Sequence, residues 1–143
     1  VVYALAELVA MRLRRYGMCA EGVGLSVREA ETLRHKSAQC TLPSATSNAS
    51  DIAKSALALL PKIHAFPAPL RAVTVAATRL TDGSVTQLSF FDTEKDERED
   101  RLDKSIDSIR TKYGYKSVGR GLMLKNDLAT NLHEEDDFLP FKR

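Results

Sequence analysis

The chain has 143 residues, of which 43% are hydrophobic and 28% charged, so we expect one folded domain with a tail and exclude a disordered, collagen-like or coiled-coil protein. Its two cysteines, Cys19 and Cys40, are too few for a disulfide framework, so a reducing, cytoplasmic location is expected. No apolar run approaches the roughly 20 residues that span a bilayer, so we expect no membrane association.

The net charge of +2 divides into two unlike regions. Residues 1–91 hold ten Lys and Arg against six Asp and Glu, a net +4, whereas residues 92–143 hold eleven against thirteen, a net −2. A helical pattern already runs at Val1, with no capping residue before it. We therefore expect a piece of a longer protein, with a mildly basic part followed by a mixed-charge part.

The basic part begins with the patterns of a helix and two strands. Residues 1–16 carry apolar residues at helical spacing, with Glu7 outside the apolar stripe. Residues 23–28 alternate apolar residues with small or polar ones, as expected for a strand with one covered and one wet face. Residues 33–42 predict a returning strand, and Pro43 is expected to end it.

A second helix, a third strand and a third helix follow. Residues 52–60 repeat the helical spacing up to Pro61, and residues 71–80 predict a β-branched strand that stops at an Asp-Gly turn. Further on, apolar residues recur at steps of four, three and four, which predicts a helix carrying Leu102, Ile106, Ile109 and Tyr113. We interpret the acidic residues around them as a solvated face of mixed charge.

Motifs of catalysis or metal binding are missing from the sequence. It contains no nucleophile elbow, no zinc-protease motif and no phosphate-binding glycine loop. The three histidines and two cysteines lack the spacing of zinc ligands, and we interpret them as surface or half-buried side chains. We therefore expect no catalytic residue, metal or cofactor in this chain.

The order of these elements, with the runs VGLSVRE, KSAQCTLPSAT and PLRAVTVAATRLTD, resembles the little-finger domain of Y-family translesion DNA polymerases of the bacterial UmuC/ImpB/MucB/SamB-like group. RLDKSIDSIRTKYGYKSVGRG looks like the extension that follows this domain. The resemblance implies an α+β fold, an antiparallel sheet with two helices packed on one face and a helical extension. It divides the chain into a partial little-finger domain (1–84), a linker with a motif and a helix (85–121), and a tail expected to be mobile (122–143).

The little-finger sheet has four strands, and the resemblance places the first of them before Val1. Only three strands are visible here, which leaves one sheet position unfilled. Because an unpaired strand edge is a hazard for pairing with another chain, we expect one of two outcomes. Either the chain dimerises through that edge, or its own SVGRGLML segment fills it.

The resemblance also implies that the sheet face opposite the helices lies along primer-template duplex DNA. Short hydroxyl and amide groups with cations hold phosphates without reading bases, so the contact is expected to be independent of base sequence. An ordinary solvated sheet face remains the alternative. The expected DNA-binding residues are Ser26, Arg28, Ser37, Gln39 and Thr74, flanked by Lys36 and Arg71.

A pentapeptide directly after the last strand resembles the bacterial sliding-clamp-binding motif. Its Gln amide suits the polar rim of a pocket, and its apolar side chains suit the interior. Packing of these side chains on the domain's own core is the alternative. The expected clamp-binding residues are Gln87, Leu88, Ser89, Phe90 and Phe91.

The hypothesis is therefore a C-terminal fragment of an error-prone translesion polymerase that grips duplex DNA and tethers the enzyme to the sliding clamp. The resemblance implies that Mg²⁺ and the catalytic carboxylates belong to a palm domain outside this sequence, so the chain alone is expected to be inactive. The alternative is a stand-alone protein-interaction module that displays the QLSFF and C-terminal aromatic segments without binding DNA.

Overall fold

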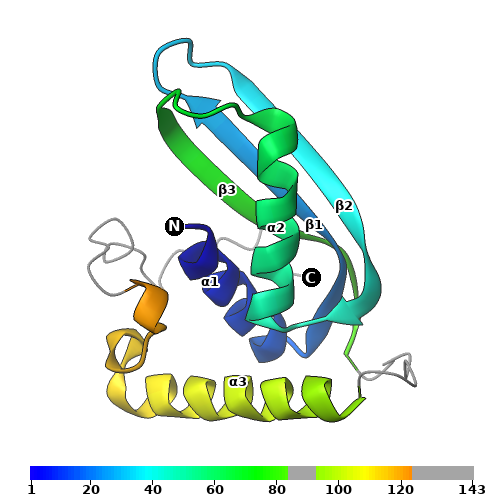
Figure 1. Cartoon of the computed structure of the whole chain (residues 1–143). Helices are drawn as coiled ribbons and strands as arrows, with labels where there is room; N and C mark the ends of the chain where they lie inside the picture. Colours follow the sequence, from blue (N-terminus) through cyan, green and yellow to red (C-terminus); the bar gives the residue numbers. More distant parts are fainter. Residues whose placement is uncertain (84–92, 124–143) are drawn as a thin grey trace.

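The computed structural model describes residues 1–83 and 93–123. The predicted order of elements is confirmed, and the fold is of the α+β class (Figure 1). The elements are α1 (Val2–Arg15), β1 (Met18–Glu29), β2 (His35–Thr46), α2 (Ala49–Ile63), β3 (Leu70–Asp82) and α3 (Thr93–Tyr113), followed by short 3₁₀ turns at Tyr115–Ser117 and Gly121–Met123.

The three strands form one antiparallel sheet with the order β2-β1-β3. The central strand β1 alternates as predicted, and its buried residues Val23, Leu25 and Val27 face the helices. It also begins earlier than predicted, at Met18. The apolar pattern is weak at the start of this strand, because the residue buried there is the small Ala20 and because Gly22 has no side chain.

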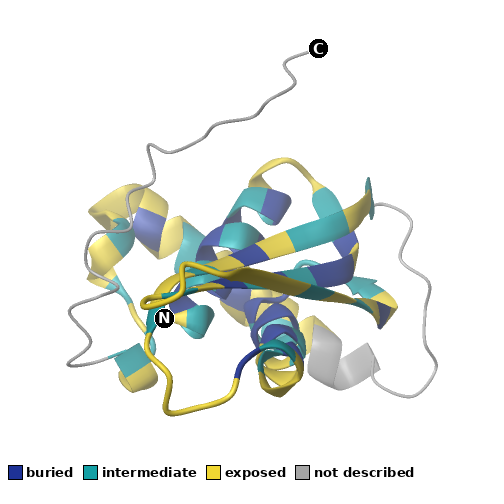
Figure 2. Ribbon diagram, turned by 90° about the horizontal axis from the view of Figure 1, so that it is seen from above, coloured by how far each residue is buried: buried dark blue, intermediate teal, exposed yellow. Residues whose placement is uncertain are grey.

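Helices α1 and α2 pack side by side on one face of the sheet, as the little-finger fold implies (Figure 1). Buried residues gather where the helices meet the sheet (Figure 2). Alanines dominate the helix surfaces in this core, which lets the two helices approach closely with little side-chain entropy lost. The buried alanines are Ala6 and Ala10 of α1 with Ala49, Ala53 and Ala56 of α2.

The prediction that Pro43 ends the second strand is wrong. Strand β2 continues to Thr46, and its register against β1 shifts between Ala20 and Gly22, which marks a bulge beside the proline. Pro43 lies between Thr41 and Thr46, where the register against β1 is interrupted, and a proline is tolerated at such a bulge because it need not donate a ladder hydrogen bond.

The apolar residues from which the third helix was predicted lie mostly on the solvent side of α3. Leu102 is 58% exposed and Tyr113 is 67% exposed, whereas Asp103 and Arg110 are only 6% and 7% exposed. The prediction of a fully solvated acidic face is wrong for the same reason. Helix α3 turns its charged side toward α1, because α1 presents the buried Glu7 and the half-buried Arg14.

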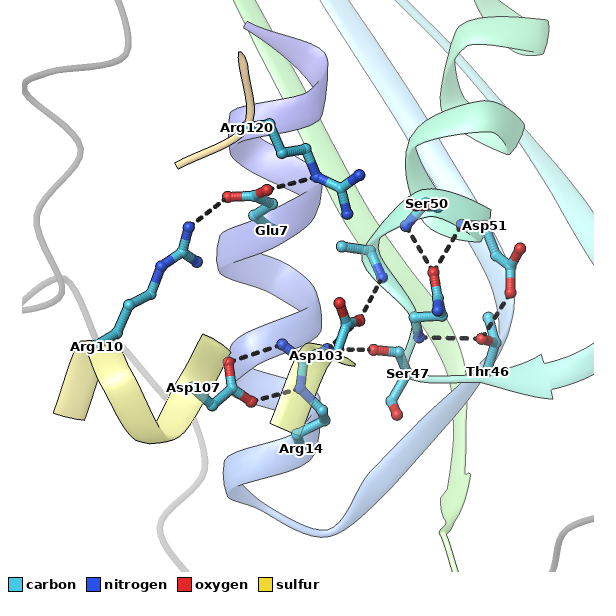
Figure 3. A network of polar contacts seen from close by, with 12 residues as sticks. Glu7, Arg14, Thr46, Ser47, Ser50, Asp51, Asp103, Asp107, Arg110 and Arg120 are labelled. Carbon is cyan, nitrogen blue, oxygen red and sulfur yellow. Dashed lines mark hydrogen bonds and ion pairs between the residues drawn. The ribbon is translucent and has the colours of Figure 1, made fainter. Parts of the chain in front are cut away.

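Arg14 connects α1 to both α3 and the start of α2 (Figure 3). Its guanidinium donates to Asp107 at 2.9 Å, to Asp103 at 3.0 Å and to the Ser47 carbonyl at 2.7 Å. Asp103 also accepts from the Ala49 N–H, at the N-terminus of α2. Negative charge there is favourable because it complements the helix dipole.

Glu7 makes the second connection between α1 and the later part of the chain, nearer than Arg14 to the start of α1 (Figure 3). Its carboxylate accepts from Arg110 at 2.8 Å and from Arg120 at 2.6 Å. Arg110 also donates to the Val118 carbonyl and lies over the Tyr115 ring, 4.5 Å from its centroid. The chain after α3 is therefore held against α1 by ion pairs. We call these two sets of contacts the α1–α3 charge cluster.

The second of the two outcomes predicted for the unfilled sheet position is wrong. The SVGRGLML segment runs from Ser117 to Leu124, and its described part contains a 3₁₀ turn at Gly121–Met123 and Arg120 bound to Glu7. It lies against α1 and adds no strand to the sheet, because its arginine is drawn to a buried carboxylate.

The pKa values of Asp103 and Arg14 are both raised in the cluster, for different reasons. Desolvation raises the pKa of Asp103 above its ordinary value, and the neighbouring Arg14 charge only partly offsets this. Desolvation lowers the pKa of Arg14, but its hydrogen bond to Asp107 and the charge of Asp103 outweigh it, so that pKa is raised overall. Because the folded pKa of Asp103 exceeds the unfolded one, its ionisation reduces stability as the pH rises between those two values.

We expect Arg14→Ala to destabilise the fold by about 3 kcal/mol at pH 7, because two carboxylates then lose their buried partner. Without Arg14 the pKa of Asp103 rises further, so the native variant retains a proton that the unfolded chain releases. The loss of stability should therefore become smaller as the pH falls toward the range in which carboxyl groups titrate. Urea unfolding at a series of pH values measures this. Lys104→Ala, an exposed cation beside Asp103, is the control and should change stability little.

The outer edges of β2 and β3 carry no further strand in the part of the chain that the structure describes. We expect the 143-residue chain to dimerise through one of these edges at high concentration. Light scattering over a concentration series measures the mass, and a monodisperse monomer throughout would contradict this expectation.

Candidate nucleic-acid interface

The sheet face opposite the helices is built in rows by the pairing of its strands, and we call it the wet face. Side chains alternate along each strand, so residues paired directly across β1 point to the same side. Ser26 of β1 pairs with Ser37 of β2 and with Thr74 of β3. The register therefore places three predicted DNA-binding hydroxyls in one continuous row.

The next row is formed around Gly24, which pairs with Gln39 on β2 and Ala76 on β3. A Cβ at Gly24 would have no neighbour closer than 3.9 Å, so the space above this strand is open. Together the two rows line a shallow hollow of about 400 Å³. The small residues let another molecule approach the backbone closely, while the amide of Gln39 stays at the rim.

Arg28 stands at one end of the wet face, paired with His35 on β2 and Ala72 on β3. Its side chain is exposed, and its planar guanidinium is a hydrogen-bond donor in the row next to that of Ser26. The structure thus brings together Ser26, Arg28, Ser37, Gln39 and Thr74, five of the seven predicted residues.

The two flanking cations lie elsewhere. Lys36 pairs with Val27, whose side chain is buried under the helices, so Lys36 points to that side of the sheet. Its ammonium donates to Glu29 at 2.7 Å, and the hydrogen bonds from Lys36 and Thr32 lower the pKa of that carboxyl. Arg71 is exposed and shares the strand parity of Val73, which packs on the core.

A third row shows residues that strand alternation did not identify. Gly22 pairs with Thr41 and Thr78, and the exposed side chain of Arg79 donates to Thr41 at 3.0 Å. Alternation predicts that Arg79 faces the helices, because its neighbour Thr78 is on the wet face. Sequence patterning carries no signal for this arginine, since its direction depends on one unusual backbone angle.

The wet face has an uneven charge. The strand positions in its four rows include cations, hydroxyls, an amide and small residues, but none of them carries Asp or Glu. A surface of this composition attracts anions and offers donors to phosphate oxygens. The acidic residues of the α1–α3 charge cluster lie against α1, on the helix side of the sheet.

The predicted clamp-binding residues Gln87–Phe91 lie outside the residues that the structure describes, as does all of the predicted tail beyond Met123. The described chain ends before this pentapeptide in β3 and resumes after it in α3.

Over residues 1–83 and 93–123, no three His, Cys, Asp or Glu side chains gather as a metal ion requires. No helix in this part of the chain combines the length and apolarity needed to cross a bilayer.

Two comparisons with known proteins agree with this architecture. Residues 1–90 match the model of the impB/mucB/samB family C-terminal domain. The chain is 33% identical over 128 residues to a DNA polymerase IV of Acetivibrio thermocellus and 31% identical over 127 residues to one of Clostridium acetobutylicum. These alignments cover 88% and 89% of the chain.

Each alignment covers 32% of the relative, so the chain spans about a third of the length of these polymerases. The family match extends over the sheet and both helices packed on it, and it confirms the Y-family resemblance. The chain therefore belongs to the impB/mucB/samB family, whose C-terminal domain it carries.

Proposed function

We propose that this chain is the duplex-gripping C-terminal part of a cytoplasmic translesion DNA polymerase. The observation that carries the proposal is the wet face, whose four rows hold hydroxyls, an amide and arginine without Asp or Glu and lie on the side of the sheet opposite α1 and α2. Two relatives that align over most of the chain are named DNA polymerase IV.

Contact through this face would be independent of base sequence. Hydroxyl and guanidinium groups donate to phosphate oxygens, which are the same at every base pair. The small residues Gly24, Ala72 and Ala76 offer no side-chain donor or acceptor that would read a base edge. A polymerase that must move along any template needs a grip of this kind.

The composition of the wet face distinguishes this proposal from an ordinary solvated sheet face. Solvated surfaces usually intersperse charges of both signs, as the exposed side of α3 does with Glu97, Arg98 and Asp100. The rows of the wet face omit one sign altogether. That asymmetry favours a polyanionic partner.

We further propose that Gln87–Phe91 tethers the protein to the sliding clamp. The pentapeptide follows β3 and precedes α3 in the chain, and both elements are held to the same domain. An anchor placed there would connect the clamp to the DNA-gripping domain over a short length of chain. Nucleotide transfer itself, with Mg²⁺, would belong to a palm domain outside these residues.

We expect the 143-residue chain to bind duplex DNA with a log affinity that falls against log salt concentration with a slope near −2, as two phosphates neutralised by the two arginines of the wet face require. Arg28→Ala should reduce that slope by about one, because one phosphate contact is lost. Fluorescence anisotropy with duplexes of unrelated sequence measures both. Lys54→Ala on α2 removes an exposed cation from the helix side and should leave the slope unchanged.

An affinity that does not depend on salt, or no affinity at low salt, would contradict DNA binding. Retained binding of protein partners in that case would favour the alternative function, a protein-interaction module.

For the clamp, we expect Gln87→Ala with Phe91→Ala to abolish binding to a purified bacterial sliding clamp, measured by calorimetry, while the melting temperature stays nearly unchanged. Leu102→Ala removes an exposed apolar side chain of α3 and should leave clamp affinity intact. A large fall in melting temperature with unchanged clamp affinity would show instead that the pentapeptide packs on the domain's own core.

A further inference from the structure

Arg79 has a backbone conformation that ordinary strands avoid. Its φ is +52°, in the left-handed region that non-glycine residues rarely adopt, although β3 continues on both sides of it. The register against β1 is the same on both sides of Arg79, with Thr78 opposite Gly22 and Leu80 opposite Ala20, and the pairing passes over Arg79 itself. The unusual angle therefore changes the direction of one side chain without displacing the strand.

The consequence of this angle is that Arg79 reaches the wet face. By alternation it would point toward the helices, as Val75 does. Instead its Nη1 donates to the Thr41 hydroxyl at 3.0 Å, and Thr41 belongs to β2, on the far side of β1. The guanidinium must therefore cross the central strand on the wet side.

Gly22 places no side chain of its own at the crossing point. It stands between Thr41 and Thr78 in the register, directly beneath the path from β3 to β2. A Cβ at Gly22 would collide with the Thr78 hydroxyl and lie 3.1 Å from the carbonyl oxygen of Cys40. The row thus has no central side chain, and the hydroxyl of Thr78 takes the space that a Cβ would fill.

We propose that Arg79 is a preorganised phosphate-binding residue of the wet face, at the opposite end from Arg28. The inference rests on the proposed DNA-gripping function and adds a residue that the sequence pattern did not suggest. An arginine has five N–H donors, and the bond to Thr41 uses one, which leaves the others for an anion. The fork of the guanidinium matches the geometry of phosphate oxygens.

The spacing of the two arginines shows that they serve different phosphates. Gly22, beneath Arg79, lies six residues from Arg28 along β1, which corresponds to about 20 Å at roughly 3.3 Å per residue. Between them lie the rows of Gly24 and Ser26, without any acidic side chain. The wet face would then hold the duplex at two separated points.

A purely structural role explains the geometry poorly. The bond from Arg79 to Thr41 joins two exposed side chains, and such a bond contributes little to stability. The left-handed backbone is unfavourable for a residue with a Cβ. Strain of this kind persists where function requires the side chain that it positions.

The test uses the 143-residue chain and fluorescence anisotropy with a random-sequence duplex of about 20 base pairs, a length that covers the wet face. Arg79→Asn removes the cation, and asparagine tolerates the left-handed backbone. We expect its affinity at low salt to fall roughly three- to tenfold and its salt slope to decrease by about one, with no loss of melting temperature.

Two further variants separate charge from positioning. Arg79→Lys keeps the charge and should keep the salt slope, with a smaller loss of affinity because the fork is gone. Thr41→Val removes the anchoring hydroxyl but no charge, so it should also lower affinity without changing the slope. If Arg79→Asn folds poorly, Arg79→Gly removes the backbone strain entirely and measures the same loss.

The outcomes distinguish this inference from the proposed function. If Arg28→Ala lowers affinity and slope while Arg79→Asn matches the unmodified chain, the role of Arg79 is refuted and DNA gripping stands. If the unmodified chain itself binds the duplex weakly and without salt dependence, the proposed function fails, and the role of Arg79 fails with it.

Discussion

The two-residue alternation of β1 is the constraint on which the rest of the structure depends. As the central strand, it pairs with both neighbours, so its parity determines which side of all three strands is buried. Val23, Leu25 and Val27 bring the helix layer to one side, and the residues between them form the rows of the wet face. A slip of one residue would bury Ser26 and Arg28 and expose the core, so folding and function impose the same register.

The α1–α3 charge cluster attaches the extension by a different kind of force. Apolar packing contributes little here, because Leu102 and Tyr113 of α3 face solvent while Asp103 and Arg110 face α1. Buried ion pairs are demanding in geometry, since each charge must keep its partner to offset desolvation. They therefore specify one position for α3 on α1, on the side of the sheet away from the wet face. The extension is held firmly and still leaves the proposed DNA surface uncovered.

A feature could be predicted from the sequence when the residues that cause it lie close together in the chain, and it was missed when they do not. The alternation of β1 and the helical spacing in α2 are local, and both elements were found, as was the row of Ser26, Ser37 and Thr74 once register was added. The buried face of α3 depends on Glu7 and Arg14, roughly a hundred residues away in sequence, and apolar periodicity pointed to the wrong side. The direction of Arg79 depends on one backbone angle, which no pattern of residue types encodes.

The same cluster gives the division of charge along the sequence a structural meaning. The first 91 residues carry a net +4, but Arg14 belongs to that total and is neutralised by Asp103 and Asp107 of the acidic region. The cluster also pairs Glu7, which belongs to the same total, with Arg110 and Arg120 of the later region. Its three carboxylates and three guanidinium groups therefore balance, so the cluster adds no net charge on the helix side of the domain. The cations of the wet face take no part in it, and no acidic side chain occupies the four rows of that face. The extension is therefore attached to α1 without opposing the attraction of an anion to the opposite face of the sheet.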